Sequence, residues 1–231
     1  MNVCIIPARG GSKRIPKKNI REFCGKPIIA YSIDAAKKSG LFEHVFVSTD
    51  SEEIANIARE YGAEVPFIRP DHLANDYTGT DAVVLHALSW LKEKECRVDY
   101  VCCIYATAPF ILPDYIQHGY LELKNANALT ALSVTTFPYC IFRSLKMTID
   151  NRVEMIWPDN FPKRSQDFPE AYHDAGQFYW ADAGRYLEGK SFFSEDTLPI
   201  VLPRHCVQDI DTEEDWVRAE IMFKAERSQE I

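Results

Sequence analysis

The chain has 231 residues, 46% of them hydrophobic and 26% charged, with a formal net charge of -8. This length allows one domain with a sizeable core, and the acidic balance argues against nucleic acid as the main partner. No apolar run approaches the roughly 20 residues that span a membrane, and no signal-peptide pattern is visible, so we expect a cytoplasmic protein. The seven scattered cysteines are expected to be reduced thiols packed in the core.

The first predicted element is a buried strand that begins at residue 2 or 3 and ends at Ile6, where turn residues follow. The next segment is a loop with two adjacent glycines and five cationic residues, Arg9, Lys13, Arg14, Lys17 and Lys18. Glycines let backbone N–H groups approach an anion, and cationic side chains neutralise phosphate charge. We therefore predict a polyphosphate-binding loop at the carboxyl end of the first strand, with a solvated basic loop as the alternative.

Other phosphate-binding motifs do not fit this loop. The chain has no G-x-G-x-x-G pattern. The pair Gly25-Lys26 is followed by Pro27 and lacks the earlier glycine of a Walker A loop. A dehydrogenase or a P-loop ATPase is therefore disfavoured.

Helices and strands then alternate along the chain. Helices are predicted over 27–38, from a cap at Asp50 or Ser51 to about Tyr61, from Thr80 or Asp81 to about Lys94, and over 113–124. Buried strands are predicted over 45–47, 65–68, 100–105 and 129–134. This β-α-β order predicts an α/β fold with a mostly parallel, Rossmann-like sheet flanked by helices.

Residues 136–171 break this alternation. The segment contains four prolines and two short strand-like pieces, at 141–143 and 153–156. An excursion of this length is usually functional or an interface arm. Strands at 176–181 and 198–202 and a helix to about Arg227 follow, so we expect residues 1–231 to form a single domain that carries this excursion.

Asp209 and Asp211 form a candidate metal site. With Ile210 between them, an extended backbone places both carboxylates on one face and Ile210 on the other. Two hard oxygen ligands suit Mg²⁺, which binds few carboxylates and completes its shell with water and phosphate oxygens. The alternative is a helix start, because Thr212 and Asp215 match a capping box, and the two interpretations are compatible.

The segment Ala8–Asn19, with the sequence ARGGSKRIPKKN, resembles the nucleotide loop of the acylneuraminate cytidylyltransferases, the CMP-sialic acid synthetase family. Arg69-Pro70 followed by Thr78 and Thr80 resembles the second nucleotide segment of that family, and Gln208–Asp215 resembles its C-terminal metal motif. The resemblance covers essentially the whole chain. It implies the nucleotide-diphospho-sugar transferase fold and a homodimer.

The resemblance also implies a reaction and assigns roles in it. The anomeric hydroxyl of a nine-carbon 2-keto sugar acid attacks the α-phosphorus of CTP and releases pyrophosphate, with Mg²⁺ on Asp209 and Asp211. Lys18, beside the α-phosphate, and Asp211 are the expected catalytic residues, and residues 136–171 form the dimerisation arm. Without the resemblance, Thr80 would be interpreted only as a helix cap. The expected nucleotide-binding residues are Arg9, Gly10, Gly11, Ser12, Lys13, Asn19, Arg69, Thr78 and Thr80.

The predicted sugar end departs from the sialic acid enzymes. They carry Leu-Gln-Pro-Thr-Ser-Pro after the fourth strand, whereas this chain has Tyr105 at the position of the glutamine. Arg164 matches an arginine that faces the sugar or its carboxylate, Arg143 replaces a lysine, and His173 stands at a second arginine position. The resemblance therefore implies a substrate that keeps its carboxylate and differs in its ring substituents.

The segments 105–110, 172–176 and 208–212 resemble the branch of the family that acts on pseudaminic acid for flagellin glycans. Pseudaminic acid is the expected nonulosonic acid substrate, with N-acetylneuraminic or legionaminic acid as the alternative. A catalytically idle nucleotide-binding protein is the alternative from another class, and the metal carboxylates argue against it. Taken alone, His173 would more often be structural. The expected sugar-binding residues are Tyr105, Arg143, Arg164, His173, Asp174 and Gln177.

Overall fold

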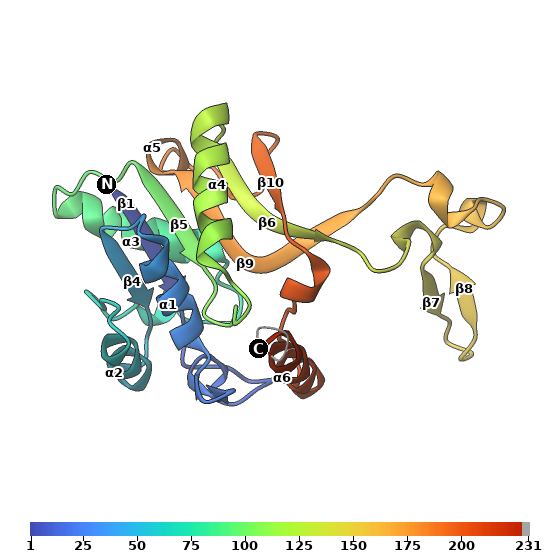
Figure 1. Cartoon of the computed structure of the whole chain (residues 1–231), viewed down its shortest axis with the longest axis horizontal. Coiled ribbons are helices and arrows are strands. Elements are labelled where there is room, and N and C mark those ends of the chain that lie inside the picture. Colours follow the sequence, from blue (N-terminus) through green and yellow to red (C-terminus); the bar gives the residue numbers. More distant parts are fainter. Residues whose placement is uncertain (228–231) are drawn as a thin grey trace.

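A six-stranded sheet forms the centre of the computed structural model, which describes residues 1–227 (Figure 1). The strand order is β10-β6-β9-β5-β1-β4. β9 is antiparallel to its neighbours β5 and β6, and the other neighbouring pairs are parallel, which confirms a mostly parallel α/β sheet. The strands are β1 Asn2–Pro7, β4 His44–Ser48, β5 Tyr100–Ile104, β6 Thr130–Thr136, β9 Tyr172–Asp182 and β10 Thr197–Val201.

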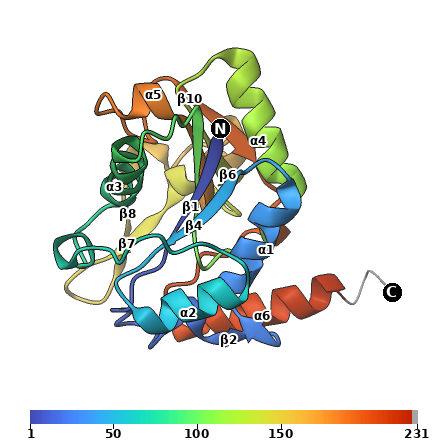
Figure 2. The same ribbon diagram turned by 90° about the vertical axis from the view of Figure 1, so that its left-hand side faces the viewer.

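Helices cover both faces of this sheet (Figures 1 and 2). Cys4 of β1 and Cys102 of β5 pack on the face covered by α1, α2 and α4. Val3 and Cys103 pack on the other face, with α3 and α5. Successive strand residues point to opposite faces, so the adjacent Cys102 and Cys103 belong to the two different core clusters. The helices are α1 Ile29–Ser39, α2 Glu52–Glu60, α3 Thr80–Glu93, α4 Pro113–Ala126, α5 Ala183–Tyr186 and α6 Glu213–Arg227.

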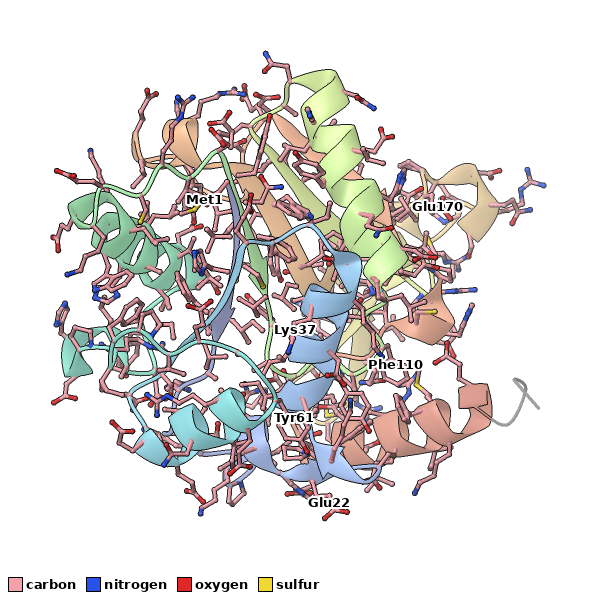
Figure 3. All side chains as sticks on the ribbon, turned by 60° about the vertical axis from the view of Figure 1, so that its left-hand side comes forward. Met1, Glu22, Lys37, Tyr61, Phe110 and Glu170 are labelled. Carbon is pink, nitrogen blue, oxygen red and sulfur yellow. The ribbon has the colours of Figure 1, made fainter. Side chains whose placement is uncertain are left out.

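The last helix, α6, packs beside the N-terminal loop and not on the sheet (Figure 2). Its Trp216 and Phe223 meet Phe23 edge-on, with ring centroids 5.5 and 5.4 Å apart. Phe110, which Figure 3 labels near α6, is also edge-on to Phe223 at 5.9 Å. The cluster buries Ile15 of the basic loop, so α6 supports that loop from below the cleft described in the next section.

The helix starts follow local chemistry. Ser51 caps α2, because its Oγ accepts a hydrogen bond from the Ile54 N–H at 3.4 Å, as predicted. The interpretation of Thr80 as the cap of α3 is wrong: Gly79 is the N-cap and Thr80 is the first helical residue. This leaves the Thr80 hydroxyl free of a capping role.

The helix predicted over 27–38 begins later, at Ile29. Pro27 lies instead in a short antiparallel ribbon formed by β2 (Glu22–Phe23) and β3 (Lys26–Pro27). Proline is common at the first turn of a helix, but it also fits an edge position without an N–H donor. Here the pairing of Pro27 with Glu22 places the proline in the ribbon and not in the first turn of α1.

The strand predicted over 65–68 is absent as an element. Two isolated parallel bridges, Phe46 with Glu64 and Thr49 with Ile68, remain in its place beside β4. Pro66 has no N–H to donate, so a continuous ladder cannot form across this segment. The segment still returns the chain to the carboxyl end of β4 and places the following residue, Arg69, there.

Residues 137–171 form an arm that projects away from the sheet (Figure 1). It contains an antiparallel hairpin of β7 (Leu145–Met147) and β8 (Val153–Met155), so the strand-like piece predicted near 153–156 is confirmed. The piece predicted at 141–143 is wrong, because it is a 3-10 turn. Apolar side chains stand exposed on the arm, with Met147 70% and Phe161 73% exposed.

None of the seven cysteines forms a disulfide within residues 1–227. Packing in the core holds for Cys4, Cys102, Cys103 and Cys206, whereas the other three are only half-buried. Burial raises the pKa of Cys4, Cys102 and Cys103 well above the usual thiol value, so these three stay protonated and act as small apolar side chains. Within residues 1–227, no helix has both the length and the apolar character needed to cross a bilayer.

Candidate active site

A cleft of about 220 Å³ opens at the carboxyl ends of β1 and β5. Pro7, the last residue of β1, and Tyr105, which directly follows β5, both line it. Open α/β sheets bind ligands at this edge, because the loops after neighbouring parallel strands meet there. The residues predicted from sequence that line the cleft are Arg9, Ser12, Lys13, Lys18, Asn19, Arg69, Thr78, Thr80, Tyr105 and Asp211.

Gly10 and Gly11 shape the basic loop. The Gly10 N–H donates to Asp50 Oδ1 at 2.8 Å, and the Ser12 N–H donates to the Gly10 carbonyl at 3.0 Å. A Cβ atom on Gly10 would lie 3.1 Å from the Ser51 Cβ, so glycine permits close packing against the start of α2. The N–H groups of Gly10 and Ser12 are therefore hydrogen-bonded within the protein. A Cβ atom added to Gly11 would point into open space.

Two cations of the loop share one carboxylate. Arg9 Nη1 donates to Asp76 Oδ1 and Lys13 Nζ donates to Asp76 Oδ2, each at 2.5 Å. These hydrogen bonds, from Lys13 first and then Arg9, lower the pKa of the Asp76 carboxyl. Asp76 is therefore ionised at neutral pH, and the cleft carries an internal anion beside its cations.

Two further cations converge on the C-terminal carboxylate of the cleft. Arg14 Nη2 donates to Asp211 Oδ1 at 2.8 Å. Lys18 Nζ lies 3.4 Å from the same oxygen and donates to the Ile210 carbonyl at 2.6 Å. The N-terminal loop and the segment before α6 are thus joined by ionic contacts, although they are almost the whole chain apart in sequence.

Asn19 supports the loop from inside. Its side chain is buried, and Nδ2 donates to the Arg9 carbonyl at 2.9 Å. This contact holds the backbone of Arg9 in place. Asn19 therefore stabilises the basic loop and also lines the cleft.

Arg69 is an almost fully buried cation, with 4% of its surface exposed. Nη2 donates to the Ser48 carbonyl at 2.7 Å and Nη1 to the Leu73 carbonyl at 3.3 Å, while Nε is buried without an acceptor. Burial lowers the pKa of the guanidinium, although arginine remains charged. A buried donor without a partner is costly unless a ligand supplies the acceptor.

A chain of hydroxyl groups connects the two sides of the cleft. The Tyr105 hydroxyl lies 2.9 Å from Thr80 Oγ1, and the Tyr105 ring centroid lies 5.0 Å from that of Tyr179. The Tyr179 hydroxyl donates to Asp174 Oδ2 at 2.6 Å. Burial raises the pKa of both tyrosines, so both hydroxyls are protonated and can donate hydrogen bonds.

β9 carries the other predicted sugar-binding residues. Its register with β6 shifts between Leu132 and Val134, and Gly176 has a positive φ of 63° at this irregularity. Such a bulge re-aims the neighbouring side chains. Gln177 there is buried, with Nε2 bonded to the Cys206 carbonyl at 2.5 Å and Oε1 without a partner, and His173 packs on Phe137 at 4.7 Å.

Arg143 and Arg164 lie in the arm and do not line the cleft of their own chain. Arg143 Nη1 donates to the Lys163 carbonyl at 3.0 Å, and Arg164 pairs with Asp167 at 2.9 Å. Both partners also belong to the arm (Figure 1). The structure therefore brings ten of the predicted residues together in one cleft and leaves these two arginines in the arm. The other predicted residues that do not line the cleft are Gly10, Gly11, His173, Asp174, Gln177 and Asp209.

The segment 209–211 has the geometry predicted for it. Ile210 is fully buried under α6, while Asp211 faces the cleft. Desolvation, followed by the nearby charge of Asp211, raises the pKa of the Asp209 carboxyl. Two crowded carboxylates of this kind fit a hard divalent cation, which would relieve their repulsion. The predicted capping box is confirmed, since Asp215 Oδ2 accepts from the Thr212 N–H at 2.8 Å.

Residues 3–195 match the family model described as Cytidylyltransferase. The chain belongs to this family. The resemblance of its nucleotide loop and the expected class of enzyme, a CTP-dependent nucleotidyltransferase, are both confirmed by the match.

Within the cytidylyltransferases, full-length relatives carry nonulosonic acid names. The pseudaminic acid cytidylyltransferase of Campylobacter jejuni is 44% identical over 223 residues, which cover 96% of each chain. The CMP-N,N'-diacetyllegionaminic acid synthase of Legionella pneumophila is 36% identical, again over 96% of each chain. A solved structure of CMP:2-keto-3-deoxy-manno-octonic acid synthetase complexed with CTP has a TM-score of 0.71 at 15% identity, covering 97% of this chain and 99% of that one. It confirms the fold.

Sequence reasoning about this cytidylyltransferase missed several residues of the site. Asp50 comes two residues after the parallel strand β4, and that position is a signal that could have identified it. Arg14 was noted only as one of the loop's charges. Asp76 lies in a turn-rich loop and Tyr179 within an apolar strand, where no local pattern marks either residue.

Proposed function

We propose that this cytidylyltransferase joins CTP to a nonulosonic acid, with pseudaminic acid as the preferred sugar, and releases pyrophosphate. The observation that carries the proposal is the convergence of Arg9, Lys13, Lys18 and Asp211 on one cleft at the end of β1. The names of the full-length relatives support the sugar class, and the pseudaminic acid enzyme has the higher identity of the two described above.

The chain's own residues would act mainly by positioning and by neutralising charge, as nucleotidyl transfer requires. Arg9, Lys13 and Lys18 would hold the triphosphate, and Lys18 would counter the charge that develops at the α-phosphate during attack by the anomeric hydroxyl. Arg69 would offer its unpartnered Nε to the nucleotide, which relieves the cost of a buried donor. Thr78 and Thr80 line the same wall.

Mg²⁺ is part of the proposal. Asp209 and Asp211 would hold it, since two carboxylates on one face suit an ion that completes its shell with water and phosphate oxygens. When bound, the ion would supply charge neutralisation and orientation of the phosphates. Desolvation first and the nearby Asp211 charge second raise the pKa of Asp209, and a cation between these carboxylates would relieve both effects.

The sugar is proposed to lie against β9 and Tyr105. Asp174, Gln177 and the Tyr105 hydroxyl offer polar groups on that side, and His173, on the same strand as Asp174 and Gln177, packs on Phe137. The unpartnered Oε1 of buried Gln177 supports a ligand donor nearby.

A homodimer completes the proposed site. Arg143 and Arg164 stay in the arm, away from the cleft of their own chain. The arm also exposes apolar side chains such as Met147, Ile149 and Phe161, which a second copy would bury. We propose that the arm of one chain brings its arginines to the partner's cleft to bind the sugar carboxylate.

A cytoplasmic location is proposed as well, since seven cysteines that form no disulfide among the described residues suit a reducing compartment.

The test is pyrophosphate release from CTP and Mg²⁺ with pseudaminic acid, legionaminic acid and N-acetylneuraminic acid offered in parallel. Preference for pseudaminic acid would support the sugar proposal. Preference for legionaminic acid, favoured by the second relative, would keep the chemistry and replace the sugar. No release with any nonulosonic acid, despite CTP binding, would favour the idle nucleotide-binding alternative.

A further inference from the structure

Asp76 does not line the cleft itself, but it bonds two of the cations that do and that phosphate oxygens would contact there. Each of its carboxylate oxygens bonds one cation, Oδ1 with Arg9 and Oδ2 with Lys13. Arg9 and Lys13 both line the cleft, and Lys13 has no other ionic partner among the described residues. A carboxylate that bridges two cations makes the contacts that a phosphate group would make with them.

The turn around Asp76 has its own scaffold. Asn75 Oδ1 accepts hydrogen bonds from the N–H groups of Tyr77 at 2.8 Å and Thr78 at 3.0 Å. The Arg69 guanidinium holds the Leu73 carbonyl at the other end of the same loop. Asp76 therefore stands at the tip of an ordered turn whose two ends rest on residues of the nucleotide cleft.

Asp76 and a bound triphosphate cannot both satisfy Arg9 and Lys13. Each cation has a limited number of N–H donors that point into the cleft, and each ligand oxygen needs one of them. The two anions would also repel each other at this distance. Because the pKa of the Asp76 carboxyl is held low, protonation does not remove the conflict near neutral pH.

We propose that Asp76 is an internal competitor of the triphosphate, which it replaces on Arg9 and Lys13 whenever the cleft is empty. The inference rests on the proposed function and adds Asp76 to it as a residue that opposes binding of the triphosphate. A ligand must bring enough negative charge to displace Asp76, so a nucleotide triphosphate succeeds where a single phosphate does not. After the reaction, the return of Asp76 helps pyrophosphate to leave.

The probe is inorganic tripolyphosphate, titrated calorimetrically at physiological salt without divalent metal. Asp76→Asn removes the competing charge and keeps the side-chain shape, so we expect it to bind tripolyphosphate about twofold to thirtyfold more tightly than the wild type, the range for two exposed ion pairs. Cytidine, which has no phosphate, should bind both proteins equally. Pyrophosphate should inhibit turnover by Asp76→Asn at correspondingly lower concentrations.

Asp71→Asn is the matched control. It removes one charge from the same loop, and the Asp71 carboxylate has no hydrogen-bond or ionic partner in the part of the chain that the structure describes. We expect its tripolyphosphate affinity to equal that of the wild type. Equal or weaker binding by Asp76→Asn, relative to Asp71→Asn, would overturn the proposal and make Asp76 a residue that merely positions Arg9 and Lys13.

Two further measurements distinguish a loss of competing charge from a disturbance of the fold. Thermal unfolding of each variant shows whether the loop change disturbs the fold, and Asp76→Ser should repeat the direction of the affinity change. The titration needs no turnover, so it is separable from the proposed function. A wild-type chain that binds tripolyphosphate but not CTP would contradict the proposed function, while tighter binding by Asp76→Asn would still support the role of Asp76.

Discussion

At the scale of single residues, Arg69 is the most costly feature of the cleft. It is buried with one donor unsatisfied, and its two hydrogen bonds go to main-chain carbonyls without a carboxylate acceptor. Folding gains little from such an arrangement. A bound nucleotide that supplies an acceptor would explain why the residue is kept there.

Replacing Arg69 with lysine should therefore damage nucleotide binding more than stability. Lysine keeps the charge but loses the planar fork and the Nε donor. We expect kcat/KM for CTP to fall about tenfold to a hundredfold, mostly through KM. The matched control is Arg59→Lys on exposed α2, where the side chain contacts Asn56 at the surface. Steady-state kinetics of both variants at varied CTP concentration measure this change. An unchanged KM for CTP in Arg69→Lys would exclude Arg69 from the nucleotide site.

Asp211→Ala tests the C-terminal carboxylate. It removes the acceptor that Arg14 and Lys18 share and one of the two proposed Mg²⁺ ligands. We expect turnover to fall by at least about a thousandfold at saturating Mg²⁺, with an unfolding midpoint close to that of the wild type, because Asp211 lies at the surface of the cleft.

Glu214→Ala provides the control for that substitution. Glu214 is an exposed carboxylate in the first turn of α6, and its side chain has no bonded partner in the described part of the chain. Near-normal turnover is expected for it. Near-normal turnover by Asp211→Ala itself would exclude this aspartate from the chemistry.

At the scale of elements, β9 carries a bulge on the side where the sugar is proposed to lie. It pairs antiparallel with β5 and with β6, and its register with β6 shifts beside Gly176. A regular strand would alternate its side chains between the two faces of the sheet, and the bulge interrupts this alternation. Beside it, Gln177 donates to the Cys206 carbonyl and Asp174 accepts from the Tyr179 hydroxyl.

α4 packs against β9 so closely that only glycine fits at one position. A Cβ on Gly119 would lie 2.9 Å from Phe178 Cε2 and 3.1 Å from Trp180 Cδ1. Alanine is otherwise the better helix former by about 1 kcal/mol. We expect Gly119→Ala to lower the free energy of unfolding by about 1–3 kcal/mol, as overpacking does.

Denaturant unfolding measures that change. His118→Ala, one residue away on the exposed side of α4, should stay within about 0.5 kcal/mol of the wild type. If Gly119→Ala proved more stable than the wild type, the close packing of α4 on β9 would be disproved.

At the scale of the whole molecule, the arm separates two arginines from the cleft they are proposed to serve. An element that projects from the sheet with exposed apolar side chains does not contribute to the core of its own chain (Figure 1). In a symmetric dimer, each arm would meet the partner's body through the same surface.

Mixing two inactive variants tests this arrangement directly. Arg164→Ala disables the arm and Asp211→Ala disables the cleft. If the arm acts on the partner, a mixed dimer has one site with both residues intact, so random exchange should restore about a quarter of wild-type activity. If the arm acts on its own chain, mixing restores nothing. Light scattering of each variant checks that dimers are present.

Much of this organisation could be predicted from local patterns. The buried strand ending at Ile6, the glycines and cations after it, and the Asp209–Ile210–Asp211 alternation are carried by neighbours in sequence. Backbone geometry alone then implies where their side chains point. The ten predicted residues that line one cleft also include Arg69, Thr78, Thr80 and Tyr105, which the family resemblance assigned and no local pattern marks.

Two elements were mispredicted for local reasons: Pro66 interrupts the expected strand at 65–68, and Pro27 pairs with nearby Glu22 instead of opening a helix. Other features depend on contacts between distant segments, which no local pattern contains. The pairing of Arg9 and Lys13 with Asp76 crosses more than sixty residues of sequence.

The sequence by itself determined most of the order of elements, the cationic and glycine-rich character of the N-terminal loop and the two carboxylates before the last helix, because these follow from residue type and spacing. Only the tertiary structure decided the antiparallel course of β9, the burial of Arg69 and the distance of the arm from the cleft. The physical reason is that strand pairing, burial and charge pairing are set by which surfaces meet, and the meeting of surfaces is a property of the folded chain.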